Sequence, residues 1–501
     1  MSLRDANVII IETSRTAVRA GLGLSELLKT PSVEIPARVG IRRGTSGDTN
    51  APTRAGSVFD AATASSSRAT SALPQHMKAA VTDYLVGTQL DDAIAAGQDV
   101  IISWPFAKGD VADWAQAEAI WKYVLFNQLQ RRRVQNESPV LLSIASGLSR
   151  LTYERICQLF FERFNVAGFG IMERPVAQLY AGNSLSGVVV DIGDYETDIT
   201  PIYEGFIVHH AKMQMALGLK DCEVYLANLL RSNQGVINTL SPPETPLDPE
   251  ALQAKLVELV QQLWRDGHIK VPSDGETAIP EDEGVTDIAA IVVAGKEKAV
   301  IESGMKKKAT AKATAAELAR AREIEALDLI TVQFAEHSLT LGKERHRMCE
   351  PLFDPTLMKN LDGLPSREGD DLCRPLQELV AHAVNLTDAD QRIYIWGGLL
   401  VTGDVTRYVR GIGFALQSRL VPFMYSPESS MDIQPRGTRL LTVPEYYAEY
   451  RESGNGYAGF LGTSITAKII FNEAGSRNYV TKSEYASRGP RSIIDMTPSL
   501  I

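Results

Sequence analysis

The sequence predicts an α/β protein with several domains, and three observations support this. Short apolar runs typical of buried strands, such as residues 8–11 and 188–190, alternate with longer segments whose apolar residues recur at helical spacing. The length of 501 residues corresponds to two to four domains at roughly 150 residues per domain. Hydrophobic residues make up 44% and charged residues 22% of the chain. This is ordinary globular composition, and large cores of this kind need no disulfide or metal support.

The charge balance and the cysteine pattern exclude several classes of function. Lys and Arg total 51 and Asp and Glu total 61, so the net charge is −10. This argues against a protein whose main task is to bind DNA or RNA, although a local basic patch is compatible with it. The histidines form no HExxH motif and the cysteines no CxxC pair, so no metal site is predicted. The four cysteines are Cys157, Cys222, Cys349 and Cys373.

The same features bear on the compartment. Unpaired cysteines at this frequency fit a reducing compartment, cytosol or nucleus. No apolar run reaches the roughly 18 residues of a membrane helix. The first seven residues lack the charge and apolar pattern of a signal peptide. A soluble intracellular protein without a membrane partner is therefore expected.

Local patterns define the elements of the first half of the chain. Residues 8–11 predict a buried strand that runs into a turn. Residues 44–72 are rich in Ser, Thr, Ala, Gly and Asp and cannot bury enough surface to offset their entropy, so a mobile loop is expected. Residues 99–129 predict a strand, a turn and a helix; residues 138–145 predict a strand; residues 149–165 predict a helix.

The second half continues the alternation. Residues 187–206 predict a hairpin, with the adjacent His209 and His210 on a further strand. Asp248 and Pro249 predict the N-cap and first turn of a helix with an apolar stripe. Residues 305–325 favour helix but have almost no apolar face, so we expect a solvated helix or a disordered arm whose lysines could bind a partner. Residues 392–396 predict a strand that enters a turn at Gly397 and Gly398.

One glycine pattern has the spacing of a dinucleotide-binding motif. Residues 454–459 read Gly-Asn-Gly-Tyr-Ala-Gly and match G-x-G-x-x-G. A dinucleotide site needs a buried strand before the motif and a βαβ unit around it. The preceding segment is no buried strand and the sequence ends soon afterwards, so a loop that leads into a helix is the preferred interpretation.

A second constellation is the stronger signal. Asp191, Gly193 and Asp194 follow a buried strand directly. Carboxylates and a glycine at such a bend can hold a metal-bound phosphate, because the glycine admits backbone N–H groups and the acids orient the waters of the metal. The strand and turn at residues 8–16 are the natural opposite wall. Asp and Gly are also the commonest turn residues, so the pattern alone leaves both interpretations open.

Ordered blocks over most of the chain resemble the actin family. They are residues 99–129, 138–206, 345–355, 395–400, 460–471 and 480–490. Within the family, residues 288–304 and 445–471 are most similar to the nuclear actin-related subunits of fungal chromatin-remodelling complexes. Residues 232–334 contain insertions without an actin counterpart.

The resemblance implies the two-lobed α/β fold shared by actin, the heat-shock ATPases and the sugar kinases, with four subdomains around a cleft. Residues 1–33, 105–181 and 457–501 would form subdomain 1, and residues 34–104, with the mobile loop 44–72, subdomain 2. Residues 182–217 and 352–456 would form subdomain 3, and residues 218–351, with the insertions, subdomain 4.

The first phosphate loop departs from the pattern of active family members. That pattern is an aspartate followed by Asn-Gly-Ser-Gly, whereas the sequence here reads Glu-Thr-Ser-Arg-Thr from Glu12. Both glycines are lost, which impairs close backbone approach to a phosphate. Arg15 stands where a small hydroxyl would face the phosphate, and the following family lysine is Arg19.

The other nucleotide contacts are also altered. Tyr195 replaces the glycine after Asp194, and the glutamine and histidine that position the attacking water correspond to Arg174 and Asp198. Gly397 and Gly398 match the adenine-side loop, but Leu399, Leu400 and Val401 replace its polar continuation. Lys296 and Glu297 could imitate the nucleobase contact of the family.

The resemblance therefore implies a degenerate nucleotide site without catalytic residues. Its members are Glu12, Arg15, Arg19, Asp191, Gly193, Asp194, Gly397 and Gly398. ATP binding is expected to be weak or absent, and no cofactor is expected. We also expect Arg15 to pair with Asp191 or Glu12 in place of a ligand, since a guanidinium can bridge carboxylates.

A partner groove is the family surface that is better preserved. The positions that match the apolar cleft between the first and third subdomains of actin are Tyr180, Ala181, Leu461, Ile465 and Ile469. The last three share one helix face, which by periodicity alone favours a core stripe. The resemblance favours a groove for a partner helix instead.

Two functions follow from these expectations. The first is a non-catalytic scaffold subunit of a nuclear chromatin-remodelling complex, which binds a long helix of the remodeller ATPase beside a second actin-related protein and contacts chromatin indirectly. The alternative is an actin-like nucleotide-binding ATPase, which the retained Asp191 and Asp194 favour. A polymerising actin is disfavoured by the altered loop and the insertions.

Overall fold

The computed structural model describes residues 7–24, 28–43, 79–135, 137–272, 328–359, 361, 374–424, 437–472 and 478–497. Its contacts divide the chain into two compact units. Unit 1 contains Met1–Gly23, Pro31–Ile171 and Ile470–Ile501, and unit 2 contains Leu24–Thr30 and Met172–Ile469. The expected loop at 44–72, the pair Lys296 and Glu297, and the segment 305–325 lie outside the described residues.

The boundary between the units differs from the predicted first lobe. Residues 172–181 and 457–469, which the resemblance assigns to subdomain 1, belong to unit 2. The division into four subdomains stays a prediction.

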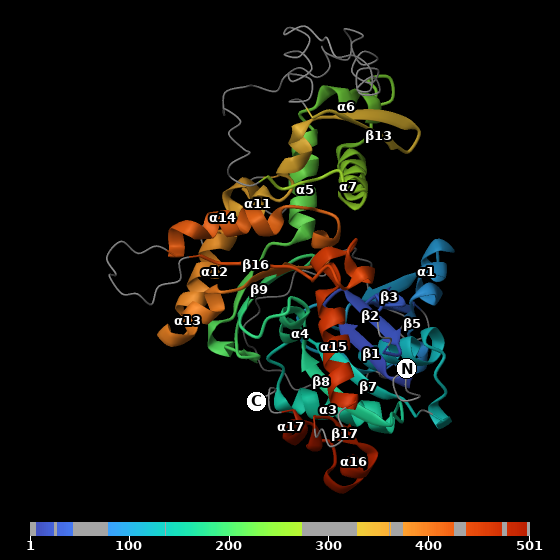
Figure 1. The fold of residues 1–501 in the computed structure, drawn as a ribbon. Helices are drawn as coiled ribbons and strands as arrows, with labels where there is room; N and C mark the ends of the chain where they lie inside the picture. The colour runs from blue at the N-terminus through green and yellow to red at the C-terminus, as the bar shows by residue number, and fades with distance from the viewer. Residues whose placement is uncertain are drawn as a thin grey trace, which may run out of the picture. The chain divides into compact units, whose positions relative to one another are not determined.

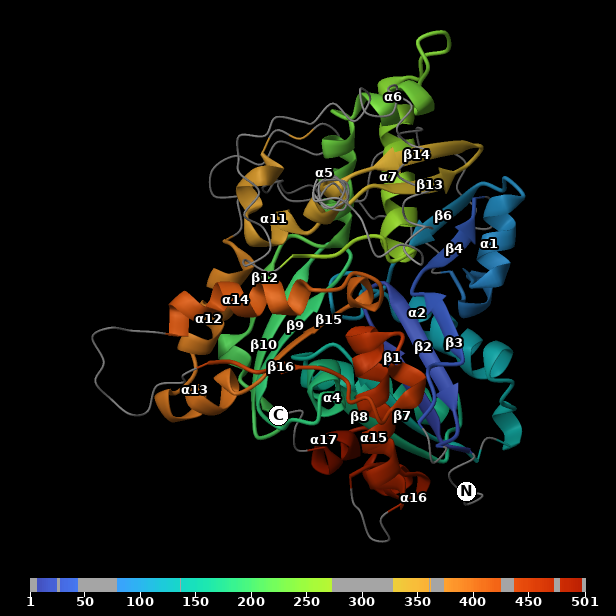
Figure 2. The same ribbon diagram turned by 45° about the horizontal axis from the view of Figure 1, so that its top comes forward.

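A six-stranded sheet with the order β17-β8-β7-β1-β2-β3 forms the centre of unit 1 (Figure 1, Figure 2). Its strands are β1 (Ile9–Thr13), β2 (Ala17–Leu22), β3 (Val33–Pro36), β7 (Pro139–Ile144), β8 (Gly168–Glu173) and β17 (Val480–Thr481). The strand β1 runs parallel to β7 and antiparallel to β2, and all five of its residues are buried. An unbroken apolar run is what a strand buried on both faces requires, so the strand predicted at residues 8–11 is confirmed.

Within its described residues, unit 1 also contains a smaller three-stranded sheet, β5-β4-β6, and five α-helices. The strands are β4 (Val39–Arg42), β5 (Leu85–Val86) and β6 (Val100–Ser103), and the helices are α1 (Thr88–Ala95), α2 (Trp114–Lys122), α3 (Arg150–Glu162), α16 (Lys482–Arg488) and α17 (Ser492–Met496). A π-helical segment, Tyr123–Gln128, continues α2. Asp113 and Ser149 cap α2 and α3 with their side chains. The elements predicted for residues 99–129, 138–145 and 149–165 are therefore confirmed.

The sheet of unit 2 has the order β11-β10-β9-β15-β16, and β12 pairs with β10. Its strands are β9 (Gly187–Ile192), β10 (Thr197–Tyr203), β11 (Phe206–Ile207), β12 (Met213–Met215), β15 (Leu399–Thr402) and β16 (Leu440–Leu441). The predicted hairpin is confirmed as β9 and β10, with β9 fully buried. The strand β15 lies parallel to β9 on its other side.

Helices and a further hairpin cover the rest of unit 2 (Figure 1). The helices are α4 (Arg174–Ala181), α5 (Leu219–Leu230), α6 (Gln234–Leu240), α7 (Pro249–Arg265), α11 (Glu350–Phe353), α12 (Leu376–Asn385), α13 (Ala389–Trp396), α14 (Ile412–Met424) and α15 (Ala458–Asn472), and the hairpin is β13 (Ile330–Phe334) with β14 (His337–Leu341). Short 3₁₀ turns are Val81–Asp83 and Arg133–Gln135 in unit 1, and His209–Ala211, Lys343–Arg347, Pro355–Met358, Asp404–Arg407, Ala448–Tyr450 and Gly454–Tyr457 in unit 2. The helix predicted after Asp248 is confirmed, with its apolar stripe buried.

Two short predicted strands are helical instead. Residues 392–396 form the end of α13, with Ile395 and Trp396 buried and Tyr394 exposed. His209 and His210 lie in a 3₁₀ turn. A run of four apolar or aromatic residues does not distinguish a strand from one helical turn, which explains the first error.

The Gly-Asn-Gly segment at residues 454–456 connects neighbouring elements of unit 2. It forms a 3₁₀ turn that leads directly into α15, as predicted. The Asn455 side chain donates to the carbonyls of Val401 (2.9 Å) and Leu441 (3.3 Å) and accepts from the amide of Val443 (2.9 Å). It thereby ties β15 to β16. Within the described ranges, no helix combines the length and apolarity that crossing a bilayer requires.

Candidate functional site

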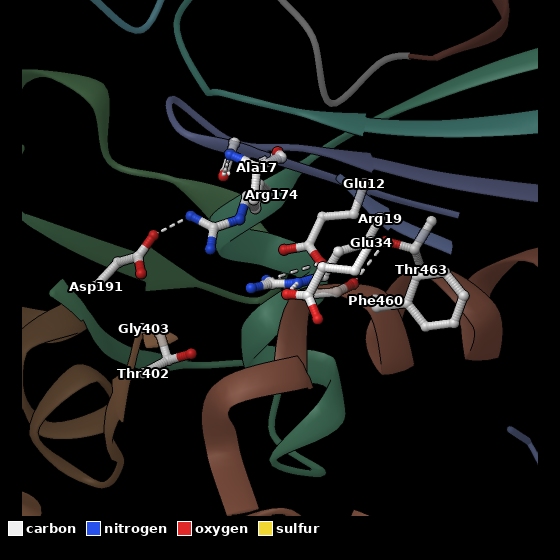
Figure 3. Close-up of polar contacts among 12 residues, drawn as sticks. Glu12, Ala17, Arg19, Glu34, Arg174, Asp191, Thr402, Gly403, Phe460 and Thr463 are labelled. Atoms are coloured by element: carbon white, nitrogen blue, oxygen red, sulfur yellow. Dashed lines mark hydrogen bonds and ion pairs between the residues drawn. The ribbon is translucent and has the colours of Figure 1, made fainter. Parts of the chain in front are cut away.

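The charged residues predicted for the nucleotide site fall into two clusters, one in each unit. In unit 1, Glu12 and Arg19 are paired across the β1–β2 hairpin. The Arg19 Nη1 atom lies 3.5 Å from Glu12 Oε2, and its Nε donates to Glu34 Oε1 at 2.8 Å (Figure 3). The side chains of Arg19 and Glu12 are only 2% and 1% exposed. Arg19 is therefore a buried cation held between two carboxylates.

The first phosphate-loop position is a closed turn between β1 and β2. The Ser14 amide donates to the Ala17 carbonyl (2.9 Å), and the Ala17 amide donates to the Ser14 hydroxyl (3.0 Å). A backbone nest that binds an anion combines right- and left-handed residues, yet none of residues 14–17 has a positive φ. The Arg15 guanidinium lies beside Gly109, where a Cβ atom would be 3.4 Å from Arg15 Nη2. This turn lacks the geometry of a phosphate loop.

In unit 2, an arginine forms an ion pair with the carboxylate that would face a metal ion. Arg174, the first residue of α4, forms an ion pair with Asp191 near the end of β9 (Figure 3). The two side chains are 14% and 11% exposed. Asp198 lies directly opposite Asp191 on β10. The guanidinium thus provides positive charge beside two neighbouring carboxylates, a place where a nucleotide site would hold its metal ion.

The backbone groups of the second loop, which contains Gly193 and Asp194, form hydrogen bonds within the protein. The Gly193 amide donates to the Glu196 carbonyl (2.9 Å), and the carbonyls of Gly193 and Asp194 accept from the amides of Leu219 and Lys220 at 2.9 and 2.8 Å. A Cβ atom at Gly218 would lie 2.6 Å from Asp194, so this close approach requires glycine. The N-terminus of α5, where an anion could bind, is capped by the loop itself.

The structure does not bring Gly397 and Gly398 to Asp191. They precede β15, whose register pairs Leu399 with Val188 and Thr402 with Asp191. Parallel strands bring together residues at the same end, so these glycines lie at the opposite end of the strand from Asp191. There Gly398 packs closely, since its carbonyl accepts from the Val188 amide at 2.8 Å.

Thr402 and Gly403 occupy the position that the sequence reasoning gave to Gly397 and Gly398 (Figure 3). Gly403 has φ +116°, and a Cβ atom there would overlap the carbonyl of Ile192. The Thr402 hydroxyl donates to the Asn455 carbonyl (2.8 Å). Ligands of α/β sheets bind beyond the carboxyl ends of strands. A polar residue and a glycine directly after the apolar run 399–401 were the signal that could have identified this loop.

The five residues of the predicted groove differ in exposure. Leu461 and Ala181 are fully buried, Tyr180 and Ile465 are half-buried, and Ile469 is 51% exposed. The helices α4 and α15 touch at Ala177 and Gly462, where a Cβ atom on the glycine would overlap the Ala177 carbonyl. The shared face of α15 therefore runs from core at Leu461 to surface at Ile469. Leu461 and Ala181 are core residues, and the other three can contact a partner.

Two further exposed apolar residues belong to chain segments that meet at Gly205, beside the Tyr180 hydroxyl. Leu185 and Phe206 are 61% and 58% exposed. The Gly205 amide donates to the Leu185 carbonyl (2.7 Å), and a Cβ atom on Gly205 would lie 2.7 Å from the Tyr180 hydroxyl. We call Tyr180, Leu185, Phe206, Ile465 and Ile469 the apolar surface of unit 2. The sequence reasoning missed Leu185 and Phe206, although an apolar residue beside a turn glycine was a visible signal.

The comparison with known families agrees with this architecture. The family model described as Actin matches residues 3–263, more than half of the 501 residues. The chain therefore belongs to the actin family and is an actin-related protein with the mixed α/β actin fold, as the resemblance predicted. Aligned over 547 residues, it is 27% identical to the SWI/SNF and RSC complexes subunit arp9 of Schizosaccharomyces pombe. The alignment covers 98% of this chain and 99% of the relative.

Proposed function

We propose that the protein is a non-catalytic, nuclear actin-related subunit of a chromatin-remodelling complex. The ion pair between Arg174 and Asp191 is the observation that carries the non-catalytic part. A guanidinium at this place repels a metal ion and occupies the carboxylate that would orient its waters. The likeness to a subunit of the SWI/SNF and RSC complexes supports the assembly and, through it, the nuclear location.

The partner in this proposal is a long helix of the remodelling ATPase, held together with a second actin-related protein. Helix-in-groove recognition requires apolar anchors and shape complementarity, and no catalytic group. The apolar surface of unit 2 supplies half-exposed anchors from α4, the α4–β9 connection, β11 and α15. Exposed apolar residues that gather on one surface often mark interaction sites, which is why we propose that a partner covers them.

A nucleotide-binding ATPase is the second candidate. Asp191, Asp194 and the Thr402–Gly403 pair supply carboxylates and a close-packed glycine around one pair of strand ends. The closed first turn and Arg174 oppose this candidate, because they remove the anion nest and add a competing cation.

ATP with magnesium is expected to leave the melting temperature of the protein unchanged. A ligand at 100 times its dissociation constant would add about 2.7 kcal/mol to the free energy of unfolding, which a thermal melt detects easily. The measurement is a melting curve at millimolar ATP and magnesium, with single-turnover phosphate release in parallel. Clear stabilisation would establish nucleotide binding, and hydrolysis that Asp191→Ala abolishes would establish the ATPase instead.

Ile469→Asp should abolish recovery of the remodelling ATPase when the tagged protein is purified from its own cells. A carboxylate at the centre of an apolar contact would be desolvated without a partner, at a cost of several kcal/mol. Since Ile469 is 51% exposed, the fold should remain intact. The matched control is Phe414→Asp, another exposed apolar residue (60%), on α14. Quantitative mass spectrometry reports the result, and equal recovery with Ile469→Asp and wild type would place the helix elsewhere.

A further inference from the structure

A groove of about 520 Å³ lies on the surface of unit 1, and none of the candidate-site residues line it. The helices α2 and α3 form its walls, and Pro490, just before α17, closes one side. The helix α17 packs against α3 (Figure 1). The apolar part of the lining is Trp114, Leu151, Leu159 and Pro490. Leu151 is 75% exposed, so the groove presents an apolar side chain to solvent.

An arginine in this groove is oriented by stacking. The Arg155 guanidinium lies over the Trp114 ring, 4.5 Å from its centroid. Stacking fixes the plane of the guanidinium and leaves the N–H groups at its edge free to donate. Arg155 is exposed, and no carboxylate among the described residues pairs with it. Its charge is therefore available to a partner.

The glutamates of the groove are already engaged. Glu118 lies 3.9 Å from Arg163, and Glu154 accepts from Arg150 at 3.1 Å. Glu162 accepts from the Tyr485 hydroxyl (2.8 Å) and from Gln158. Glu118 and Glu154 therefore balance arginines of the protein itself, and Glu162 is stabilised by neutral hydrogen-bond donors, so all three carboxylates already have partners within the protein.

Three consecutive arginines add positive charge beside one end of the groove. Residues 131–133 are all arginine, and the Arg133 guanidinium donates to the Glu162 carbonyl (3.2 Å) at the end of α3. Asn165 donates to the Arg133 carbonyl (2.8 Å), which fixes this loop beside the helix. Arg132 is exposed, and the adjacent Val134 is 90% exposed. An arginine-rich loop with an apolar tip thus borders the groove.

We propose that this groove and its arginine loop bind a short acidic peptide segment of a partner protein, with one apolar residue as its anchor. The anchor would pack on Leu151 and Leu159, and carboxylates would accept from Arg155 and Arg132 in the bidentate manner that guanidinium favours. This surface is distinct from the apolar surface of unit 2 and does not depend on the proposed function. Charge complementarity selects the partner, since the loop and Arg155 are cationic in a chain of net charge −10.

A nucleic acid fits this surface less well than a peptide. The three glutamates of the lining repel a continuous run of phosphates, whereas a peptide can place its few carboxylates on the arginines alone. The exposed Leu151 and Val134 side chains match an apolar residue and offer nothing to a phosphate backbone.

The test is fluorescence anisotropy with three labelled probes at physiological salt. The first is a dodecapeptide with one central leucine flanked by four glutamates, the second has glutamine in place of each glutamate, and the third is a 12-nucleotide single-stranded DNA. We expect the full chain to bind the acidic peptide, and to bind the glutamine peptide and the DNA at least tenfold more weakly. Absence of acidic-peptide binding, or tighter binding of the DNA, would overturn the proposal.

Variants then place the binding on this surface. Arg155→Glu and Arg132→Glu should each weaken the acidic peptide at least tenfold, with an unchanged melting temperature because both side chains are exposed. The matched control is Arg265→Glu, an exposed arginine that also stacks on a tryptophan, Trp264, at 5.3 Å. It should bind the peptide like wild type. Equal loss in the control, or no loss in Arg155→Glu, would show that binding is non-specific or elsewhere.

Discussion

Replacement of Arg19 by methionine should lower the free energy of unfolding of unit 1 by about 3–5 kcal/mol, as expected when one partner of a buried ion pair is removed. Arg19 is 2% exposed and lies between Glu12 and Glu34. Methionine fills a similar volume but removes the cation beside the Glu12 carboxylate, which is 1% exposed in the core. Most of the loss in the free energy of unfolding comes from the buried charge of Glu12, and little comes from lost packing.

A second substitution separates these two contributions. In Arg19→Met with Glu12→Leu, the stranded charge is gone and most of the stability should return, because well-packed apolar residues can replace a buried pair. The exposed pair of Arg43 and Asp99 is the control, with side chains 62% and 64% exposed. Arg43→Met should cost less than about 1 kcal/mol.

Hydrogen exchange of peptides from the β1–β2 hairpin measures the effect locally, which matters because two units need not unfold together. Protection should fall in Arg19→Met and recover in the double variant. Unchanged protection in Arg19→Met would mean that the ion pair contributes little, and a double variant as unstable as the single one would assign the cost to packing.

The strands and helices were predictable where local pattern alone determines them. The strands β1, β7 and β9 are apolar runs with buried side chains, and the helices α2 and α3 begin at Asp113 and Ser149, whose side chains cap them. Buried strands in the middle of a sheet need unbroken apolar sequence, and a cap needs a specific residue type. Both signals are complete within a few residues.

The charge pairing was not predictable in the same way. The sequence reasoning expected Arg15 to pair with Asp191 or Glu12, and that pairing stays a prediction, but the pairs seen are Arg174 with Asp191 and Glu12 with Arg19. The second pair depends on the hairpin register, which places Glu12 opposite Arg19. The first depends on how α4 begins relative to β9. Register and helix placement are tertiary properties, so sequence spacing does not reveal them.

The choice of Gly397 and Gly398 shows the same limit. The two glycines resemble a loop motif, but residues 389–396 before them are a helix, and the strand of this segment comes after them. Taking that segment for a strand moved the expected loop to the wrong end of β15, away from Thr402 and Gly403. An error of one element in secondary structure thus displaced a site by a full strand length.

Gly462→Ala should destabilise unit 2 by about 2–3 kcal/mol, although alanine is the better helix former. Helix propensity alone predicts a gain of about 1 kcal/mol, whereas a Cβ atom at Gly462 would overlap the backbone carbonyl of Ala177, so α15 and α4 must separate and lose packing. A backbone carbonyl, unlike the end of a side chain, cannot rotate away, and the steric term should therefore exceed the propensity term. Gly437→Ala is the control, because a Cβ atom there has no neighbour within 4 Å.

Since α15 carries Ile465 and Ile469, its displacement should also reduce recovery of the remodelling ATPase, whereas Ile469→Asp should reduce recovery without loss of stability. Denaturant unfolding of the variants measures the first effect, and a Gly462→Ala protein as stable as wild type would show that α4 and α15 do not pack as closely as the structure has them.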